Sequence, residues 1–211
     1  MQRHRRPFGL LVVVAIATGW VLWTGTPRAR AGIFDDIADE QVDPDKMVED
    51  TAMAEHAGFL YLARGDSLYQ CDAETLGTLR EIRLRDVRKL GTAAVGVIDG
   101  FLYVVKDDRV FKFDPEHLDL VAMADMDHSA GRAHPGMVAD GDSLYVAVRD
   151  FAYRFRLSDL QELGRAELKH SPERGACAAS LAGRWLYVAK ETRIYKIDTE
   201  SMTRVGQSKF D

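Results

Sequence analysis

Four tyrosines spaced 42 residues apart constrain this chain more than any other feature of its sequence. Tyr61, Tyr103, Tyr145 and Tyr187 each lie in a similar stretch, and the four stretches read GFLYLARGDSLYQCD, GFLYVVKDDRVFKFD, DSLYVAVRDFAYRFR and RWLYVAKETRIYKID. The similarity extends to an alignment of residues 43–210 without a gap. A fixed period of this length indicates one supersecondary unit that is repeated four times.

Each repeat contains four short extended segments. In repeat 2 they are predicted at Ala94–Ile98, Phe101–Val105, Arg109–Asp114 and Leu120–Met126, with Asp99-Gly100 as a break of hairpin length. β-branched and aromatic runs, interrupted every few residues, leave no room for the helices of a helical solenoid. Repeats of four short strands are typical of β-propeller blades. We therefore predict an all-β chain in which residues 51–211 form a β-propeller of four blades.

Residues that recur at the same position of each repeat predict where they lie in a blade. Small residues recur in the first strand, where we expect strands to approach closely: Ala52, Ala94, Gly136 and Ala178. Aspartate ends the third strand in three repeats, where we expect its carboxylate to bind backbone amides of a turn: Asp72, Asp114 and Asp198, with Arg156 as the exception. Two apolar columns mark the fourth strand: Leu79, Val121, Leu163 and Val205, then Leu84, Met126, Leu168 and Phe210. The four tyrosines are predicted to pack in the core.

Repeat 3 carries the most specific motif. Residues 131–141 read Gly-Arg-Ala-His-Pro-Gly-Met-Val-Ala-Asp-Gly, residues 144–147 read Leu-Tyr-Val-Ala, and Ile197-Asp198 occurs in repeat 4. These residues resemble the YVTN-type β-propeller repeat, which is similar to PQQ and WD40-like repeats. The resemblance covers 168 of the 211 residues and implies the fold alone, since repeats 1, 2 and 4 lack the Gly-x-x-Pro element. Related quinoprotein repeats place a tryptophan in the fourth strand, whereas Trp185 lies in the second.

The terminal repeats show no polar cap. Leu68, Tyr69 and Cys71 of repeat 1 are as apolar as their counterparts in repeat 4. Because a repeat array with free ends needs polar outer faces, blade 1 should pack on blade 4 or on another chain. A closed ring of four blades and half of an eight-blade homodimer are both consistent with this pattern. An open arc, or a fragment of a longer gene product, is a less favoured third reading.

Residues 1–31 are predicted to be a signal peptide. Three arginines precede an apolar run at residues 10–23, which is short for a membrane helix, and Ala29-Arg30-Ala31 is a small-x-small cleavage motif that places Gly32 at the mature N-terminus. An uncleaved anchor is the alternative. Arg5-Arg6-Pro7-Phe8 is similar to a twin-arginine export motif, but the general secretory route is favoured. The protein is thus expected in the periplasm or outside the cell.

Loss of residues 1–31 removes five arginines and no acidic residue, so the formal charge changes from −5 to −10. Such an acidic chain is a poor partner for nucleic acid, and we expect membrane contact only through the N-terminal segment. Residues 32–50 form an acidic linker, a short amphipathic helix or a strand that clasps the ring. Cys71 and Cys177 fall at different strand positions, so we favour two buried thiols over a disulfide.

The candidate binding residues lie in loops that join a fourth strand to the next first strand. Propeller ligands usually bind on the face formed by these loops and by the turns between second and third strands. Two loops align as His-Ser-x-x-Arg, and the candidate residues are His128, Arg132, His134, His170 and Arg174. Imidazole and guanidinium groups together suit an anionic group. The alternative is that the pattern anchors loops. The histidines lack tight metal-ligand spacing, and we predict no metal and no other cofactor.

This sequence gives little indication of a catalysed reaction. It contains no Gly-x-Ser-x-Gly elbow, no Cys-His pair in local register and no phosphate-binding glycine loop. The favoured reading is an exported, non-enzymatic binding or scaffold protein of a bacterial envelope, with a protein partner or a small anionic ligand on the loop face. The alternative is a periplasmic enzyme or redox accessory protein with a cofactor or anionic substrate over the central channel.

Overall fold

The computed structural model describes residues 51–87, 92–127, 134–170 and 176–210. All of them belong to one compact unit, Met47–Asp211. The predicted signal peptide, its cleavage site at Ala31 and Gly32, and the acidic segment 32–50 lie outside the described residues. No helix capable of spanning a membrane occurs within the described ranges.

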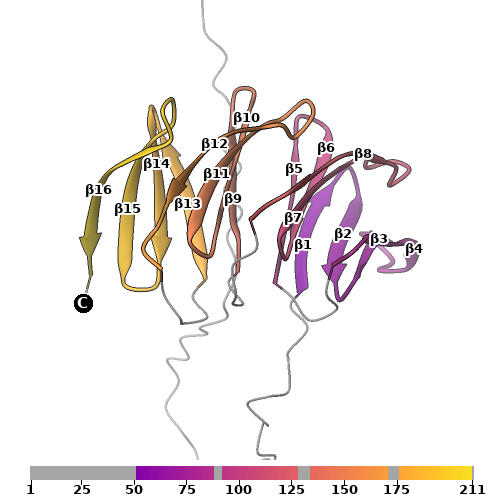
Figure 1. Ribbon diagram of the computed structural model, residues 1–211. Helices are drawn as coiled ribbons and strands as arrows, with labels where there is room; N and C mark the ends of the chain where they lie inside the picture. Colours follow the sequence, from indigo (N-terminus) through magenta and orange to yellow (C-terminus); the bar gives the residue numbers. More distant parts are fainter. Residues whose placement is uncertain (1–50, 88–91, 128–133, 171–175, 211) are drawn as a thin grey trace, which may run out of the picture. The chain divides into compact units, whose positions relative to one another are not determined.

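Sixteen strands in the described residues form four antiparallel sheets of four, which we call blades 1 to 4 (Figure 1). Blades 1 and 2 consist of β1 (Thr51–His56), β2 (Phe59–Arg64), β3 (Ser67–Asp72), β4 (Thr78–Arg83), β5 (Ala93–Ile98), β6 (Phe101–Lys106), β7 (Arg109–Phe113) and β8 (Leu120–Asp125). Blades 3 and 4 consist of β9 (Gly136–Asp140), β10 (Ser143–Val148), β11 (Phe151–Arg156), β12 (Glu162–Glu167), β13 (Cys177–Ala182), β14 (Trp185–Lys190), β15 (Arg193–Asp198) and β16 (Thr203–Lys209).

The predicted strands of repeat 2 agree with β5–β8 to within one residue at each end. The hairpin between β5 and β6 is made by Asp99 and Gly100, which have φ of 49° and 76°. A positive φ at the second turn position explains the glycine there. The repeat even preserves an irregularity, because the register shifts between the third and fourth strands at the same aligned position in every blade. The 42-residue period is therefore a structural period.

The core of the protein lies between consecutive blades. Three apolar clusters join blade 1 to blade 2, blade 2 to blade 3, and blade 3 to blade 4. Tyr61, Tyr103 and Tyr145 are 1–4% exposed, and each packs in the cluster shared with the following blade. The prediction of core tyrosines is confirmed for these three. Tyr187 in blade 4 is only half-buried, and no further blade of the described chain follows it.

Hydrogen bonds between blades repeat with the same period. The hydroxyl groups of Tyr61 and Tyr103 donate to the carbonyls of Pro115 and Leu157, each at 3.0 Å. A second donor column meets the same carbonyl position in each following blade: Gln70 to Pro115 at 3.1 Å, Lys112 to Leu157 at 2.8 Å and Arg154 to Thr199 at 3.0 Å. The acceptor residues are 42 apart. Every internal junction thus has one polar contact point in addition to its apolar cluster.

Gly136 confirms the close approach predicted for the first strands. A Cβ atom at this position would lie 2.8 Å from the backbone nitrogen of Ala179 and 2.9 Å from the carbonyl oxygen of Cys177. Both atoms belong to the backbone of β13 in the next blade. Backbone atoms at this distance leave no space for a side chain, so only glycine fits where β9 meets β13.

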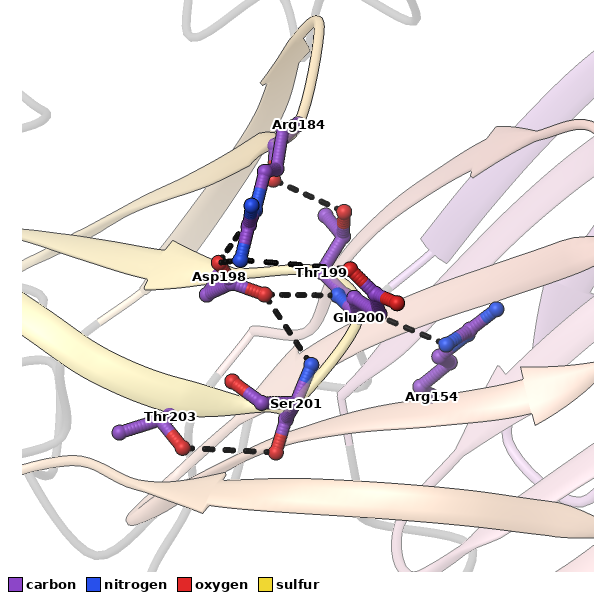
Figure 2. A network of polar contacts seen from close by, with 7 residues as sticks. All are labelled: Arg154, Arg184, Asp198, Thr199, Glu200, Ser201 and Thr203. Atoms are coloured by element: carbon purple, nitrogen blue, oxygen red, sulfur yellow. Dashed lines mark hydrogen bonds and ion pairs between the residues drawn. The ribbon is translucent and has the colours of Figure 1, made fainter.

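The aspartate column behaves as predicted at the end of the third strand. One carboxylate oxygen of Asp114 accepts from the amides of Glu116 at 2.9 Å and His117 at 3.0 Å, and Asp72 and Asp198 make the equivalent pair of bonds. Figure 2 shows Asp198 between these two amides and the guanidinium group of Arg184. In blade 3, where Arg156 replaces aspartate, Asp159 accepts from the amide of Gln161 and pairs with Arg156 at 3.0 Å.

These turns predict a stability that falls in acid. Backbone hydrogen bonds, above all those from Thr75, His117 and Ser201, lower the pKa values of Asp72, Asp114 and Asp198 respectively. Since the folded pKa lies below the unfolded value of about 3.9, the contribution is complete above that pH and is lost as the pH falls through the folded pKa. Thermal melts from pH 7 to pH 2 should show a midpoint that declines below about pH 4.

The matched control replaces all three aspartates by asparagine. An asparagine oxygen still accepts from the turn amides but does not titrate. We expect a flatter dependence of the melting midpoint on pH in the triple variant. An unchanged dependence would show that other carboxylates cause the acid sensitivity.

The two cysteines are free thiols, as favoured over a disulfide. Cys177 is buried at the start of β13, and burial raises the pKa of its thiol to about 11. The expectation of a buried thiol is wrong for Cys71, which is only partly buried in β3. Its counterparts Phe113, Phe155 and Ile197 are buried in the clusters that each blade shares with the preceding one. Blade 1 has no preceding blade among the described residues, and this leaves Cys71 partly open.

Candidate functional site

Two of the five predicted binding residues lie in the described part of the chain. His170 follows β12, and His134 lies two residues before β9; His128, Arg132 and Arg174 lie outside the described residues. His170 is the more exposed of the two, with 72% of its side chain accessible. His134 is half-buried, and its carbonyl oxygen accepts a hydrogen bond from the amide of Cys177 at 2.8 Å. Both residues therefore lie at the junction of blades 3 and 4.

His170 belongs to a charged cluster that spans this junction. Its Nδ1 lies 2.6 Å from one carboxylate oxygen of Asp150, in the turn between β10 and β11. The other oxygen of Asp150 accepts from Nζ of Lys190, the last residue of β14, at 2.8 Å. Lys190 also donates to the carbonyl oxygen of Lys169 at 2.9 Å. One carboxylate from blade 3 thus binds a loop residue and a cation of blade 4.

Lys190 and Asp150 in this cluster are shielded from solvent, whereas His170 is exposed. The side chain of Lys190 is 3% exposed and that of Asp150 is 15% exposed. Burial is the largest single influence on the Asp150 carboxyl and raises its pKa, but hydrogen bonds from Lys190 and His170 outweigh burial and leave the pKa below its usual value. Asp150 is therefore a carboxylate at neutral pH and a fixed partner for both cations.

The turns between second and third strands also contribute polar groups to this junction. Arg149 and Glu191 occupy the aligned turn position in blades 3 and 4, with φ of 55° and 54°. Within the described residues, Nε of Arg149 and one carboxylate oxygen of Glu191 are buried atoms without a hydrogen-bond partner. The junction therefore concentrates polar groups from two turns and one loop.

Sequence reasoning found His170 but missed Asp150 and Lys190. The alignment does place Asp150 in a column with Asp66 and Asp108, and Lys190 in a column with Arg64 and Lys106. An acidic turn column beside a basic column at the end of the second strand was the available signal. Its meaning depends on the contact between consecutive blades, which the alignment of single repeats does not show.

The charged cluster offers one exposed imidazole, that of His170, to a ligand or a partner. Among the described residues, no group of three or more histidine, cysteine and acidic side chains could hold a metal ion. The ammonium group of Lys190 is already paired with Asp150 and with the carbonyl oxygen of Lys169. The imidazole of His170 is exposed, and its contact with Asp150 holds it in place.

Comparison with solved structures identifies the architecture. BamB from Moraxella catarrhalis superposes with a TM-score of 0.58 and 12% identity over 75% of this chain and 52% of that chain. The chain has the β-propeller fold. The computationally designed Ika8 protein superposes with the same TM-score and identity over 75% of this chain and 48% of that one. KlHsv2 with a Gly-Ser linker in place of loop 6CD matches with a TM-score of 0.53, 10% identity and coverage of 75% and 53%.

These propeller proteins share the fold and little sequence. The chain spans about half the length of each. No family model matches this sequence, so the YVTN type of its repeats stays a prediction. No curated protein matches it either.

Proposed function

We propose that this propeller protein is exported to the bacterial envelope and acts there as a non-enzymatic binding protein, with a protein partner on the loop face at the junction of blades 3 and 4. The observation that carries the proposal is the cluster of His170, Asp150 and Lys190. Its buried charges neutralise one another and tie a loop to two blades, while the imidazole remains exposed. Such a preorganised surface suits recognition, because little ordering is required when a partner binds.

Export is supported by the sequence of residues 1–31, with its arginines, apolar run and small-x-small motif before Gly32. Export to the envelope also bears on which partners the protein can bind. A propeller that functions in the envelope meets partners outside the cytoplasm, and the negative charge of the mature chain favours partners with basic or neutral surfaces.

One experiment in cells tests location and binding surface together. A photoreactive amino acid replaces His170 in the full-length chain, and irradiated cells are separated into cytoplasmic and envelope fractions. We expect a discrete protein adduct on the chain that starts at Gly32, recovered with the envelope. The same amino acid at Leu163, an exposed residue on the outer strand β12, is the matched control and should give no such adduct.

Two results would contradict the proposal. An unprocessed chain confined to the cytoplasm would exclude export, and equal adducts at both positions would exclude a specific loop surface. A thermal-shift titration with inorganic phosphate tests the anionic-ligand alternative. A saturable rise in melting temperature that His170→Ala abolishes would favour that alternative over a protein partner.

A further inference from the structure

Among the described residues, no element covers the face of blade 1 that corresponds to the face by which blades 2, 3 and 4 each pack on the preceding blade. Leu76 is 69% exposed, whereas the aligned residues Leu118, Leu160 and Met202 are 3%, 2% and 5% exposed. Other apolar residues on this face are also more open than their counterparts in blade 2, all of which are buried. We call the set the head face: Met53, Leu60, Leu62, Tyr69, Cys71 and Leu76.

A pocket marks the head face. It is lined by Leu62, Tyr69 and Cys71 together with the polar residues around the β2–β3 turn and Thr78. In the junction of blades 2 and 3, the aligned residues Val146, Tyr153 and Phe155 pack in one cluster with Tyr103 of the preceding blade. The pocket in blade 1 therefore lies where a tyrosine of a preceding blade would insert.

In blade 4, apolar residues of the opposite face are exposed. Ile194 is 42% exposed, although the aligned residues Leu68, Val110 and Ala152 are fully buried. Phe210 is 45% exposed, and its counterparts Leu84, Met126 and Leu168 are 1–5% exposed. We call this set the tail face: Tyr187, Ala189, Ile194, Lys196 and Phe210.

The hydrogen bonds at the internal junctions also have a direction. Their donors lie on the face that corresponds to the tail face, and their acceptor lies in the following blade. Tyr187 and Lys196 are the fourth members of the two donor columns that begin with Tyr61 and Gln70. The carbonyl of Ala73 is the aligned acceptor in blade 1. Its own amide bonds to the carbonyl of Gly58, as the amides of the aligned acceptor residues Leu157 and Thr199 bond to Asp142 and Arg184. The two faces thus carry a donor pair and an acceptor in matching positions.

We propose that the tail face of one chain packs on the head face of a second copy, and the reverse, to give an eight-blade ring of two chains. Tyr187 of each copy would insert into the head-face pocket of the other, with Tyr187 and Lys196 donating to the Ala73 carbonyl. The two faces differ from each other, so the contact is heterologous, and two identical contacts close the ring.

A second copy fits better than closure within one chain. The three junctions inside the chain are fully packed, yet Leu76 and Ile194 stay open, and among the described residues no comparable packing joins β1–β4 to β13–β16. The chain also superposes on about half the length of BamB and of Ika8. Apolar end faces without polar caps are unfavourable in water, and a second copy covers both of them.

Light scattering on the exported protein, purified from the envelope, tests the proposal. We expect twice the mass of one chain at micromolar concentration and a single-chain mass for Leu76→Asp or Ile194→Asp. The controls are Leu79→Asp and Val205→Asp, which should keep the doubled mass. These two residues belong to an outer-strand column that is 42–53% exposed in all four blades, so they lie outside the proposed contact.

Mixing the two disrupted variants distinguishes head-to-tail pairing from a symmetric contact. The Leu76→Asp chain retains its tail face and the Ile194→Asp chain retains its head face, so an equimolar mixture should form a heterodimer of weakened affinity through one intact contact. Alkylation of Cys71 gives a second readout, since it should be at least tenfold slower in the wild type than in Leu76→Asp. Cys177, buried within the chain, should react in neither.

A wild type that remains a single chain at 100 μM, with Cys71 as reactive as in Leu76→Asp, would overturn the proposal. A single chain in which Cys71 is protected would show instead that blade 4 closes on blade 1 of the same molecule, which also overturns it. Failure of the two controls to keep the doubled mass would show that the contact uses a different surface.

Discussion

Replacing Asp150 by alanine is expected to destabilise the fold by about 3 kcal/mol, which corresponds to a fall in melting temperature of about 10 °C for a chain of this size. The reason is Lys190, whose side chain is 3% exposed and would lose the carboxylate that lies 2.8 Å from its Nζ. An ammonium group buried without its counter-ion is far more costly than the pair is favourable. Chemical denaturation monitored by tryptophan fluorescence measures the effect.

Two matched variants separate the buried contact from the exposed one. His170→Ala removes the other partner of Asp150, but this partner is 72% exposed, and the expected loss is at most about 1 kcal/mol. Asp150→Leu combined with Lys190→Met removes both buried charges and should lie within about 1 kcal/mol of the wild type. If Asp150→Ala were no more damaging than His170→Ala, the buried ion pair would not be what holds the blade 3–blade 4 junction together.

The contrast between these variants bears on the proposed binding surface. If the exposed imidazole contributes little to stability, His170 can be replaced without disturbing the loop beneath it. A loss of partner binding in His170→Ala would then report recognition and not unfolding. The ion pair of Asp150 and Lys190 is a positioning element, and His170 is the group that a partner would touch.

The repeat pattern predicted the blades because each strand, hairpin and turn depends on residues close in sequence. The β5–β6 hairpin at Asp99-Gly100 and the amide bonds of Asp114 are local structures of this kind. The candidate site was predicted only in part. His170 stood out because its loop aligns with the preceding one. Asp150, which His170 contacts, and Lys190, which contacts Asp150, lie 20 residues away on either side and come from two blades.

The difference between local structure and contacts between blades also explains why Tyr187 is only half-buried. Four tyrosines in one alignment column predict four equivalent environments, yet the environment of each is supplied by the next blade. Three of them have that neighbour among the described residues, and the fourth does not. A sequence period describes the unit but not the way an array of units ends, so the exposure of Leu76 and Tyr187 became evident only from the packing.

Gly136→Ala should destabilise the protein by about 2 kcal/mol, although alanine suits a strand better than glycine does. Its φ is not in the left-handed region, so replacement by alanine should by itself favour folding by about 0.4–1 kcal/mol through the unfolded chain. The added methyl group would lie 2.8 Å from the Ala179 nitrogen and 2.9 Å from the Cys177 oxygen. Because both are backbone atoms, relief requires β9 to move away from β13, and the steric cost exceeds the entropic gain.

Gly96→Ala is the matched control for this steric argument. The new Cβ would also approach a neighbour at 2.8 Å, but that neighbour is the terminal methyl group of Met137, which can rotate aside. We expect Gly96→Ala to leave the free energy of unfolding within about 0.5 kcal/mol of the wild type in urea titrations. Equal stability of both variants would mean that β9 and β13 can separate at little cost. The His134 carbonyl, which bonds to the Cys177 amide across the same contact, would then not be held firmly at the junction.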